Sequence, residues 1–500
     1  AMRNLRRLAA LGLLGQHGFF DALDCTRART GGGGQIVRCV MAHHQGMSLL
    51  AACNALCGDQ VRRWFFADPA MRAHATLLSE RLPLGAPALR RRAEQPAEKA
   101  RRRALPDYAA EGTGIDAEAP RCALLSNGTY CLAVSEAGQS FARWHAPSPT
   151  GLAAGIVWML SPFVLAALGA PNAAGAAPLS RAAQRELLGW AKATWQYFET
   201  FCTAEDHYLP PDNVQSQPPT GTAHRTSPTN MGLALVSALG AHALGIDDGQ
   251  GLALAERMLT TMEQLPRWNG HFYNWYHTCT LRPMPPLYVS TVDSGNCAAA
   301  LLTAANALRG WGQNELAARA QMLCDGMDFG PLYDPQRRLM HIGIDTGSGK
   351  WSESYYDLLS SEARLTSYFA VARGDVPREH WRALSRAQVQ KDHYRGCVSW
   401  SGSMFEYLMP ELFLPPVRDS LLWESAQFCL YVQRRRVRPG QAWGVSESAY
   451  FALDSALSYR YKAHGCAALA LQPGMDRELV LSPYSSFLAL AVEPRAAMRN

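Results

Sequence analysis

Helical hydrophobic patterns fill most of residues 180–500 and are the feature that most constrains the fold. Two more such patterns, Leu5–Leu14 and Val40–Leu56, lie in residues 1–80. Together they indicate roughly a dozen helices with few strand signals, which predicts an all-α fold whose paired helices close into a double ring. Because glycine, proline and aromatic residues gather in the connecting loops, we expect a functional site at one end of that ring. The helices predicted in the larger region are 182–203, 229–244, 252–264, 293–309, 313–325, 357–373, 378–387, 418–434 and 446–456.

The composition narrows the class of protein. With 48% hydrophobic and 18% charged residues, the chain is neither a disordered protein nor a protein of many membrane spans. Its net charge of +6 is too small to argue for a nucleic-acid partner. The 13 cysteines are an odd number without repeating spacing, which argues against a disulfide framework and for a reducing compartment. The chain has no CxxC pair or phosphate-binding glycine loop, so we predict neither a metal nor a cofactor.

The stretch between the two helical regions has a different character. Residues 81–150 are predicted to be an arginine- and proline-rich linker followed by a β-hairpin around Asn127-Gly128. Leu152–Ala170, within the apolar segment 151–179, carries no charged residue and is nearly long enough to cross a bilayer. The pattern is equally compatible with a membrane-span remnant and with a buried core helix.

The two ends of the chain share a short sequence. Ala497–Asn500 repeats Ala1–Asn4, so that joining the ends gives one uninterrupted sequence, EPRAAMRNLRRLAALG. We therefore expect a circularly permuted order, produced either by a permuted gene or by a sequence that was opened at an arbitrary point.

Glu362 is the first of three glutamates that are candidates for acid–base chemistry. It falls on a predicted helical stripe with Leu358 and Leu365, so that a lone carboxylate lies on an apolar face. Burial favours the protonated form of a carboxyl group, and a general acid for glycosidic cleavage must be protonated near neutral pH. A buried Glu362 paired with Arg364 or Arg282 is equally compatible with the pattern.

Glu447 and Glu406 are the other two candidates. Glu447 lies between Ser446 and Ser448 at the start of a predicted helix, where it could serve only as a helix cap. Glu406 lies in the mostly apolar segment SWSGSMFEYLMPEL. Any two of the three could form a catalytic pair, with carboxyl groups about 5–5.5 Å apart in a retaining glycosidase and about 6.5–9.5 Å apart in an inverting one.

Aromatic and polar side chains alternate in the predicted loops. Flat apolar rings beside amide and carboxylate groups suit sugar rings, although they also suit ordinary packing. The pattern favours a carbohydrate groove. The residues concerned are Tyr273–His277, Trp351, Tyr355–Asp357, Trp400 and Trp443.

The adjacent residues His43 and His44 lie on the predicted helix Val40–Leu56. Neighbours on a helix point about 100 degrees apart, so the two imidazoles cannot both face one metal ion. His44 shares a stripe with Val40 and Met47. This position favours an inward-facing, hydrogen-bonding histidine.

Six segments carry longer motifs: HRTSPTNMGLAL (224–235), GHFYNWYHTCTLRPMPPLYVSTVDSGN (270–296), YYDLLSSEARL (355–365), SWSGSMFEYLMP (399–410), WGVSESAY (443–450) and MAHHQGMSLLA (41–51). They closely resemble the middle, glycoamylase-like domain of cyclic β-1,2-glucan synthases, in circularly permuted order. The similarity covers most of 180–500 and 1–80. Residues 124–144 resemble the start of the following phosphorylase-like β-sandwich, and the apolar run before residue 180 resembles the last membrane segment before the barrel.

The resemblance implies an (α/α)6 barrel that cuts a linear β-1,2-glucan and transfers the glycosyl unit to the chain's own end, closing a ring with retained configuration. Retention needs a nucleophile and an acid/base residue. The matching motifs assign Glu362 as acid/base and Glu447 as nucleophile, with the roles open to exchange and Glu406 in reserve. The residues expected to line the glucan subsites are Asp212, Asp293, Asn274, Trp275, Tyr356, Asp357, Trp400, Trp443 and His44.

Two alternatives stay open beside ring closure: an endo-β-1,2-glucan hydrolase of the same fold and a non-catalytic glucan-binding module. His277, Cys279 and Asp21 stand where the family usually has Asp, Arg and Glu, which could weaken a subsite. The resemblance further implies a place at the bacterial inner membrane, with the catalytic domain in the cytoplasm beside a membrane-bound glycosyltransferase domain. The chain has neither that domain nor a complete phosphorylase domain, so we expect only the middle domain's activity.

Overall fold

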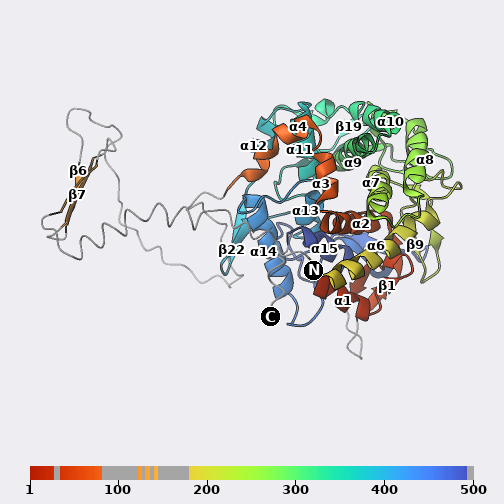
Figure 1. The fold of residues 1–500 in the computed structure, drawn as a ribbon, viewed down its shortest axis with the longest axis horizontal. Coiled ribbons are helices and arrows are strands. Elements are labelled where there is room, and N and C mark those ends of the chain that lie inside the picture. The colour runs from red at the N-terminus through yellow and green to blue at the C-terminus, as the bar shows by residue number, and fades with distance from the viewer. Residues whose placement is uncertain (27–33, 82–121, 127–129, 136–139, 145–178, 493–500) are drawn as a thin grey trace. The chain divides into compact units, whose positions relative to one another are not determined.

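The computed structural model divides the chain into two compact units. Unit 1 comprises Ala1–Arg91 and Pro178–Asn500, and unit 2 comprises Arg92–Ala177. In unit 1, helices from residues 1–80 and from the larger helical region share one hydrophobic core (Figure 1). The described residues are 1–26, 34–81, 122–126, 130–135, 140–144 and 179–492.

Three helices form the centre of unit 1: α2 (Ala42–Leu56), α7 (Pro228–Leu244) and α9 (Thr291–Gly310). They pack in that order, and most of their residues are buried. Small residues permit the close approach of α2 and α7, because a Cβ atom added at Gly46 would lie only 2.8 Å from the Cβ atom of Leu233. A larger residue at this crossing would push the helices apart.

Other helices surround these three. They are α1 (Met2–Ala10), α3 (Gln60–Phe65), α4 (Pro69–Ala73), α6 (Arg181–Phe201), α8 (Gly251–Gln264), α10 (Asn314–Asp325), α11 (Arg364–Arg373), α12 (Glu379–Ala383), α13 (Met404–Leu408), α14 (Leu421–Arg435) and α15 (Pro483–Leu488), with 3-10 turns η1 (Ala75–Ser79), η2 (Gly330–Leu332), η3 (Met409–Leu412) and η4 (Ala489–Ala491). Helices α6 and α15 contact α2, while α10 and α11 contact α9. Serine hydroxyls accept a backbone N–H at the start of α6, α7, α9 and α14, which explains where these helices begin.

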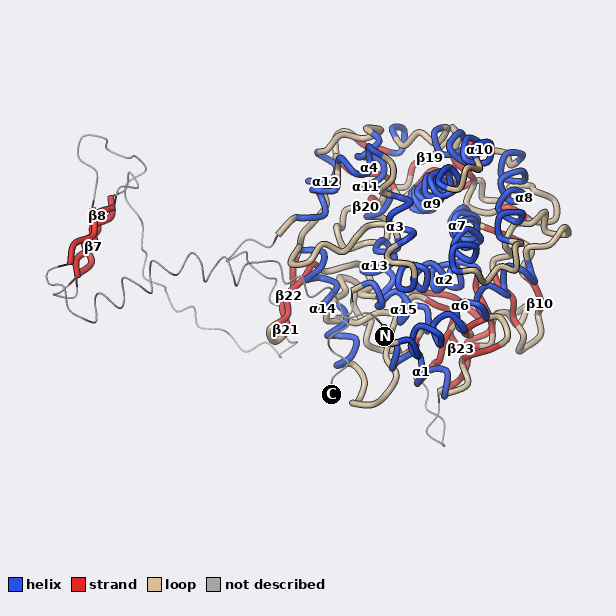
Figure 2. The backbone as a smooth tube through the Cα atoms, in the orientation of Figure 1, coloured by secondary structure: helices blue, strands red, loops and turns tan. Residues whose placement is uncertain are grey.

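Small antiparallel sheets occupy the loops between the helices (Figure 2). The chain pairs distant segments in this way: the strand before α2, β5, pairs with β9, which follows α6. The sheets of unit 1 are β1 (Leu14–Gly15) with β2 (Gly18–Phe19); β10 (Gly221–Thr222), β9 (Asn213–Gln215) and β5 (Cys39–Met41); β11 (Arg225–Thr226) with β14 (Tyr276–His277); β12 (Arg267–Trp268) with β13 (His271–Phe272); β15 (Tyr288–Ser290), β18 (Gly343–Asp345) and β19 (Lys350–Trp351); β16 (Tyr333–Asp334), β17 (Leu339–His341) and β20 (Tyr355–Tyr356); β21 (Gln388–Lys391) with β22 (Tyr394–Cys397); β23 (Ser448–Leu453) with β24 (Tyr459–Lys462); and β25 (Val480–Leu481), β3 (Ala22–Asp24) and β4 (Gln35–Val37).

The described part of unit 2 is a three-stranded antiparallel sheet of β6 (Cys122–Ser126), β7 (Tyr130–Ser135) and β8 (Ser140–Trp144). Ser126 pairs with Cys131, so β6 and β7 form the hairpin that the sequence predicted around Asn127-Gly128. The predicted linker and the apolar segment Leu152–Ala170 lie outside the described residues. Among the helices that are described, none combines the length and the hydropathy needed to cross a bilayer.

Most of the predicted helices are confirmed, and two predictions are wrong. The helix predicted over 357–373 begins only at Arg364, because Leu358 bridges to Ser385 and the Ser361 hydroxyl accepts the Ala363 N–H in a tight turn. The helix predicted over 446–456 is strand β23 instead, which pairs with β24.

The all-α class holds for the core of unit 1, but not for its loops. The core is built from helices, whereas the loops form the small sheets described above. The closed ring of paired helices stays a prediction.

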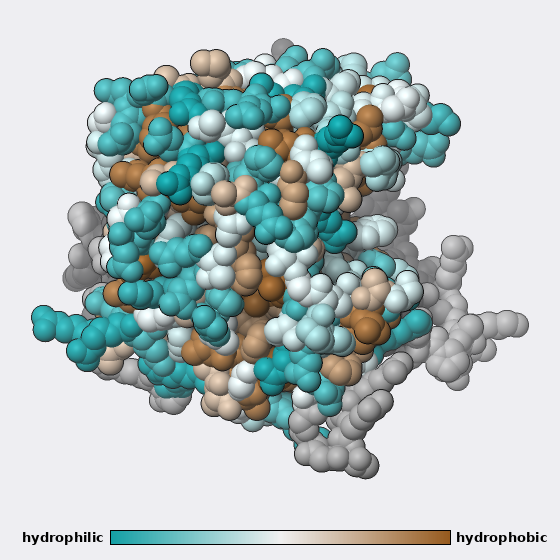
Figure 3. All heavy atoms as spheres, turned by 90° about the vertical axis from the view of Figure 1, so that its right-hand side faces the viewer, coloured by the Kyte–Doolittle hydropathy of each residue, from teal (hydrophilic) through white to brown (hydrophobic). Residues whose placement is uncertain are grey.

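One face of the molecule is shown in Figure 3. Hydrophilic and hydrophobic residues are interspersed over it, and no single broad apolar patch dominates. Large contiguous apolar patches mark membrane or protein contacts. Figure 3 shows no patch of that kind on this face.

Candidate functional site

Loops of unit 1 enclose a cavity of about 430 Å³ that brings together residues far apart in the sequence. It is lined from the start of α2, from β9, from the start of α9, from the turn before α11, and from β24. Its lining residues are Met41, His43, Asp212, Asn213, Arg225, Ser227, Thr229, Asn274, Trp275, Val292, Asp293, Asn296, Glu362, Phe405, Glu447, Tyr459 and Tyr461.

Glu362 lines this cavity from the turn that precedes α11. Burial, followed by the carboxylates of Glu406 and Glu447, raises the pKa of Glu362 to about 8. Arg364, one of the two arginines that the sequence offered as a partner for Glu362, forms its ion pair with Glu411 at 3.1 Å. Glu362 is therefore suited to hold a proton at neutral pH.

Glu447 lines the same cavity from the residue before β23. Burial and the Glu406 carboxylate raise its pKa to about 7, while His44 and hydrogen bonding from Tyr461 act in the opposite direction. Glu362 and Glu447 thus face one space, and the acid of higher pKa is Glu362.

Glu406 belongs to α13 and does not line the cavity. Its carboxylate accepts five hydrogen bonds: from the Ser399 hydroxyl (2.8 Å), from the Ser401 N–H (2.9 Å) and hydroxyl (2.6 Å), and from the Ser403 N–H and hydroxyl (both 3.0 Å). Ser403 and Glu406 form a capping box at the start of α13. These bonds occupy the Glu406 carboxylate. Glu406 also contributes to the raised pKa values of Glu362 and Glu447.

A polar wall of the cavity is built around Asp293, in the first turn of α9. Thr229 Oγ1 donates to Asp293 Oδ1 at 2.6 Å. With the Asn274 amide nitrogen toward Asp293 Oδ2, Asn274 donates at 3.0 Å and its oxygen accepts from Trp275 Nε1 at 3.2 Å. Burial raises the pKa of Asp293. The wall offers carboxylate and amide groups beside an indole.

A second set of polar contacts joins this wall to Asp212. Arg225 donates to Asp212 Oδ2 from Nη2 at 3.0 Å and from Nε at 3.2 Å, and its guanidinium lies 4.7 Å from the Trp275 ring centroid. Asn230 donates to Asp212 Oδ1 at 3.1 Å. The Arg225 guanidinium thus links Asp212 to the Trp275 ring.

Five of the residues predicted for the subsites do not line the cavity. Tyr356 is half-buried, and burial, followed by Glu362 and Asp293, raises its pKa well above the usual value. Asp357 and Trp400 are exposed, and Trp443 is buried in the core. His44 is buried just behind the cavity. The remaining four, Asp212, Asp293, Asn274 and Trp275, line it.

Sequence reasoning missed several polar residues that line the cavity, among them His43, Arg225 and Tyr461. The stripe that turns His44 inward places His43 on the neighbouring face of α2, so the pattern contained the signal for His43. Tyr461 gave none, because its hydroxyl reaches the site only through the pairing of β24 with β23.

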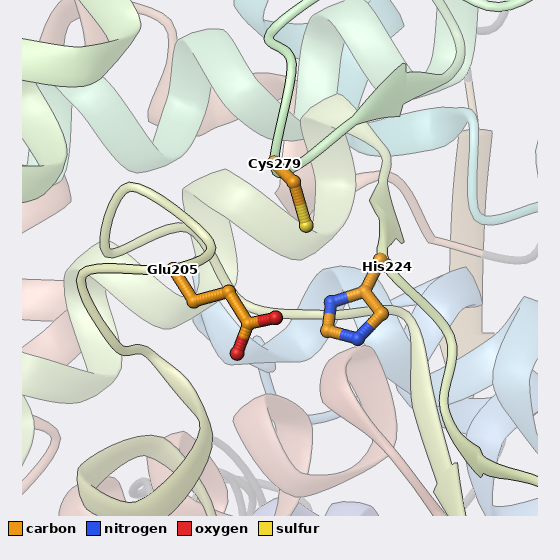
Figure 4. Close-up of side chains that lie close together, drawn as sticks. All are labelled: Glu205, His224 and Cys279. Atoms are coloured by element: carbon orange, nitrogen blue, oxygen red, sulfur yellow. The ribbon is translucent and has the colours of Figure 1, made fainter.

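Within the described residues, one group of side chains could hold a metal ion: Glu205, His224 and Cys279, whose ligand atoms lie within 4.8 Å of one another (Figure 4). Asp206 lies beside them and accepts from His224 Nδ1 at 2.8 Å and from Cys279 Sγ at 3.8 Å. The hydroxyl of Thr278 donates to the same Asp206 oxygen. This hydrogen bonding accounts for the arrangement of His224 and Cys279 without an ion.

No protein-family model matches the chain. Among curated proteins, the cyclic beta-(1,2)-glucan synthase NdvB of Rhizobium meliloti (strain 1021) is 30% identical to this chain. The match covers 76% of this chain and 18% of that protein. The chain therefore spans less than a fifth of the relative's length.

Solved structures also resemble the chain, at low identity. The endo-beta-1,2-glucanase from Chitinophaga pinensis has a TM-score of 0.42 and 14% identity, and the match covers 54% of this chain and 82% of that one. A putative glucoamylase from Bacteroides fragilis NCTC 9343 has a TM-score of 0.44 and 16% identity, covering 59% and 75%. The beta-1,2-glucanase from Parabacteroides distasonis has a TM-score of 0.43 and 12% identity, covering 67% and 50%.

The match to NdvB confirms the resemblance carried by the six motifs, while the permuted order stays a prediction. In sequence, the chain is similar to cyclic β-1,2-glucan synthases.

Proposed function

We propose that this protein cleaves linear β-1,2-glucan with retention of anomeric configuration and transfers the glycosyl unit to the chain's own end, giving a cyclic glucan within an (α/α)6 barrel. The observation that carries the proposal is that Glu362 and Glu447 line one cavity with raised pKa values. Paired carboxyl groups of this kind are the machinery of retaining glycosidases. The similarity to cyclic β-1,2-glucan synthases supports β-1,2-glucan as the substrate.

In the first step Glu362 donates its proton to the glycosidic oxygen while Glu447 attacks the anomeric carbon. The glycosidic bond breaks, the leaving sugar departs with the proton, and a glycosyl ester forms on Glu447. In the second step Glu362 removes a proton from the incoming hydroxyl group, whose oxygen attacks the anomeric carbon and displaces Glu447. When the hydroxyl belongs to the same chain the product is a ring, and when it belongs to water the product is linear.

The pKa values support this division of roles. A pKa of about 8 keeps Glu362 protonated at neutral pH, whereas a pKa of about 7 leaves much of Glu447 ionised. Activity needs both conditions, so the rate should be highest between these two values and fall on either side.

Subsites for the glucan belong, in this proposal, to the polar wall of Asp293, Asn274 and Asp212, with Trp275 as a flat apolar surface. Carboxylate and amide groups hydrogen-bond sugar hydroxyls, and an indole packs against C–H faces. We include Tyr356 beside this wall because it adjoins Glu362.

The test is a product analysis on linear β-1,2-glucan. Ring closure gives products lighter by one water than the linear glucan of the same length, with no new reducing ends. Short linear products with new reducing ends would instead show that the protein hydrolyses the glucan. If Glu362→Gln left the behaviour towards glucan unchanged, the site would be a binding module and the enzymatic proposal would be wrong.

The proposed activity requires a supply of linear glucan. The relative is named a synthase, and the chain spans 18% of it. We therefore place the protein beside a membrane-bound glycosyltransferase that makes the chain, at the bacterial inner membrane with the cavity in the cytoplasm. Co-purification of the two proteins from membranes would test this placement.

A further inference from the structure

His44 and Asp21 form a buried pair behind the cavity. His44 Nδ1 lies 2.5 Å from Asp21 Oδ1, and each residue is only 2% exposed. The second oxygen of Asp21 accepts the backbone N–H of Ala449, two residues after Glu447, at 2.7 Å. The carboxylate therefore ties α2 to β23, the strand that follows Glu447.

The other nitrogen of His44 points to the cavity. His44 Nε2 lies 3.4 Å from the hydroxyl oxygen of Tyr461, which lines the cavity together with Glu447, and hydrogen bonding from Tyr461 lowers the pKa of Glu447. The His44 ring is stacked on Tyr484, with centroids 3.9 Å apart and an angle of 13° between the planes. Tyr484 also donates to the backbone carbonyl of Glu447 at 2.9 Å, so the imidazole is held in place by the same residue that holds the Glu447 backbone.

We infer that Asp21, His44 and Tyr461 form a hydrogen-bonded relay that positions the Glu447 carboxylate and favours its ionised form. His44 is thus a positioning residue that acts through Tyr461 and not a sugar-binding residue. Nδ1 of His44 faces Asp21 and Nε2 faces the Tyr461 hydroxyl, so the imidazole joins the two groups into one path that leads to Glu447. The inference deepens the proposed function and rests on it for the catalytic meaning of Glu447.

The charges around Glu447 show why such a relay is needed. Three carboxyl groups approach it from other elements: Glu406 of α13, Asp293 of α9 and Glu362 before α11, and all three oppose its ionisation. His43 also lies 3.3 Å from the Tyr461 hydroxyl, but burial and His44 lower its pKa to about 3, so it brings no positive charge.

Of the neighbouring side chains that shift the pKa of Glu447 most, His44 and Tyr461 are the two that lower it. A nucleophile must be ionised to attack. The relay supplies the compensation that the acidic surroundings require.

The experiment measures the ionisation of Glu447 directly. The ¹³C resonance of the Glu447 carboxyl group, assigned by its loss in Glu447→Gln, is titrated in protein labelled at glutamate carboxyl carbons. We expect His44→Gln and Tyr461→Phe each to move the titration up by about one pH unit, since each removes a group that favours the anion. The double variant should move no further than the larger single effect, because both residues act along one path.

Tyr461→Phe removes only a hydroxyl from a side chain that is 39% exposed, so it keeps the test valid should His44→Gln not fold. His380→Gln is the matched control, a fully buried histidine with two hydrogen bonds on α12. It should leave the Glu447 titration in place. An unmoved titration in both His44→Gln and Tyr461→Phe, or equal shifts in His380→Gln, would overturn the relay.

The acid limb of the kcat/KM profile on β-1,2-glucan gives the catalytic readout. It should move up by the same amount in both variants, while the basic limb, which reports Glu362, stays in place. The NMR titration needs no substrate, so a relay without glucan activity would reject the proposed function and keep the relay. An active enzyme with an unmoved titration would do the reverse.

Discussion

Three glutamates meet in one region of this molecule, and their surroundings separate their roles. Glu406 accepts five hydrogen bonds from serine residues, so its carboxylate is held and occupied. Glu362 has one such donor, the Ser361 hydroxyl at 3.2 Å, and is surrounded by negative charge. Glu447 lies between these cases, with Tyr461 and His44 offsetting its acidic neighbours. Burial, followed by the neighbouring carboxylates, raises the pKa of Glu362 and of Glu447.

The roles of Glu362 and Glu447 can be separated by azide. Removing either carboxyl group should lower the rate on glucan by roughly 10²–10⁴-fold. On an aryl β-glycoside of a β-1,2-glucan oligosaccharide, azide should restore turnover in both variants. In Glu447→Ala azide takes the place of the nucleophile and gives the α-glycosyl azide, whereas in Glu362→Ala it attacks the glycosyl-enzyme and gives the β-glycosyl azide.

The anomer of the azide product, read by proton NMR, is the measurement. The exposed Glu256→Gln on α8 serves as the control and should behave like the unmodified protein. The β-glycosyl azide from Glu447→Ala and the α-glycosyl azide from Glu362→Ala would exchange the assigned roles.

Burial of Glu362 should also make stability depend on pH. Its pKa rises from 4.5 to about 8 on folding, so between these values the folded state binds a proton that the unfolded state has released. The free energy of unfolding must then fall as pH rises from about 4.5 to about 8, by at most about 1.4 kcal/mol per pH unit. Glu362→Gln removes this dependence. The free energy of unfolding of the variant, relative to that of the unmodified protein, should therefore be higher at pH 8 than at pH 5.

Denaturant unfolding of both proteins at pH 5 and pH 8 measures the effect, with Glu256→Gln again as the control. If the stability difference between Glu362→Gln and the unmodified protein were the same at both pH values, the carboxyl group would not be protonated in the folded state.

At the scale of elements, one tight loop fixes the position of α13 and of Glu406. Gly402 has φ of +72°, and a Cβ atom there would lie 2.5 Å from the carbonyl oxygen of Cys466 and 2.9 Å from the Ala470 nitrogen. Its N–H donates to Ser399 Oγ at 3.0 Å. Only glycine satisfies both the backbone angle and the close approach. The hydrogen bonds from the serine residues of this loop to Glu406 therefore depend on this position.

Gly402→Ala should therefore be more costly than the backbone angle alone requires. Gly440 provides the matched comparison, since its φ is +90° and nothing lies within 4 Å of an added Cβ atom. We expect Gly440→Ala to cost about 1 kcal/mol in the free energy of unfolding and Gly402→Ala at least about 2–3 kcal/mol. Equal costs in denaturant unfolding would show that the loop yields without strain.

Long buried helices were predictable from the sequence, and the structures around the two cavity glutamates were not. The patterns over 229–244 and 293–309 match α7 and α9 closely, because a sustained apolar period determines a helix. The segment after Glu447 was misread because SAYFAL is short, and its pairing with β24 decides its conformation. Glu362 was singled out on a predicted helical stripe, but α11 begins only at Arg364, so Glu362 lies in the turn before the helix.

The candidate site was predictable as a set of residue types more than as a geometry. Asp212, Asp293, Asn274 and Trp275 were chosen from motifs and line the cavity. The relay through Tyr461 could not be found in this way, since it depends on which strand edge lies over α2. Hydrogen bonds between distant segments leave no periodic signal in a sequence.

At the scale of the whole molecule, residues 1–80 and 178–492 build one core. Helix α2 packs against α6, α7 and α15, which come from both ends of the remaining chain. The Asn4 side chain donates to the Trp443 carbonyl and to Ser486 Oγ, each at 2.7 Å, and accepts the Trp443 N–H at 3.0 Å. Two chain segments so interlocked should fold and unfold together.

Matched substitutions in the two segments test this cooperativity. Leu50 of α2 and Leu235 of α7 are fully buried in the same core. Replacing either by alanine should cost about 2–5 kcal/mol through lost burial and the cavity left behind. Leu11→Ala, at a site that is 52% exposed, removes the same atoms and should cost well under 1 kcal/mol.

The decisive measurement is the shape of the thermal transition, followed by calorimetry and by near-ultraviolet circular dichroism. A single core requires Leu50→Ala and Leu235→Ala to shift one common transition by both probes. Two separate transitions, each moved by only one variant, would mean that residues 1–80 fold apart from the rest. In that case the cavity, which takes His43 from one segment and Glu447 from the other, would form only on docking, and its activity would disappear at the lower of the two midpoints.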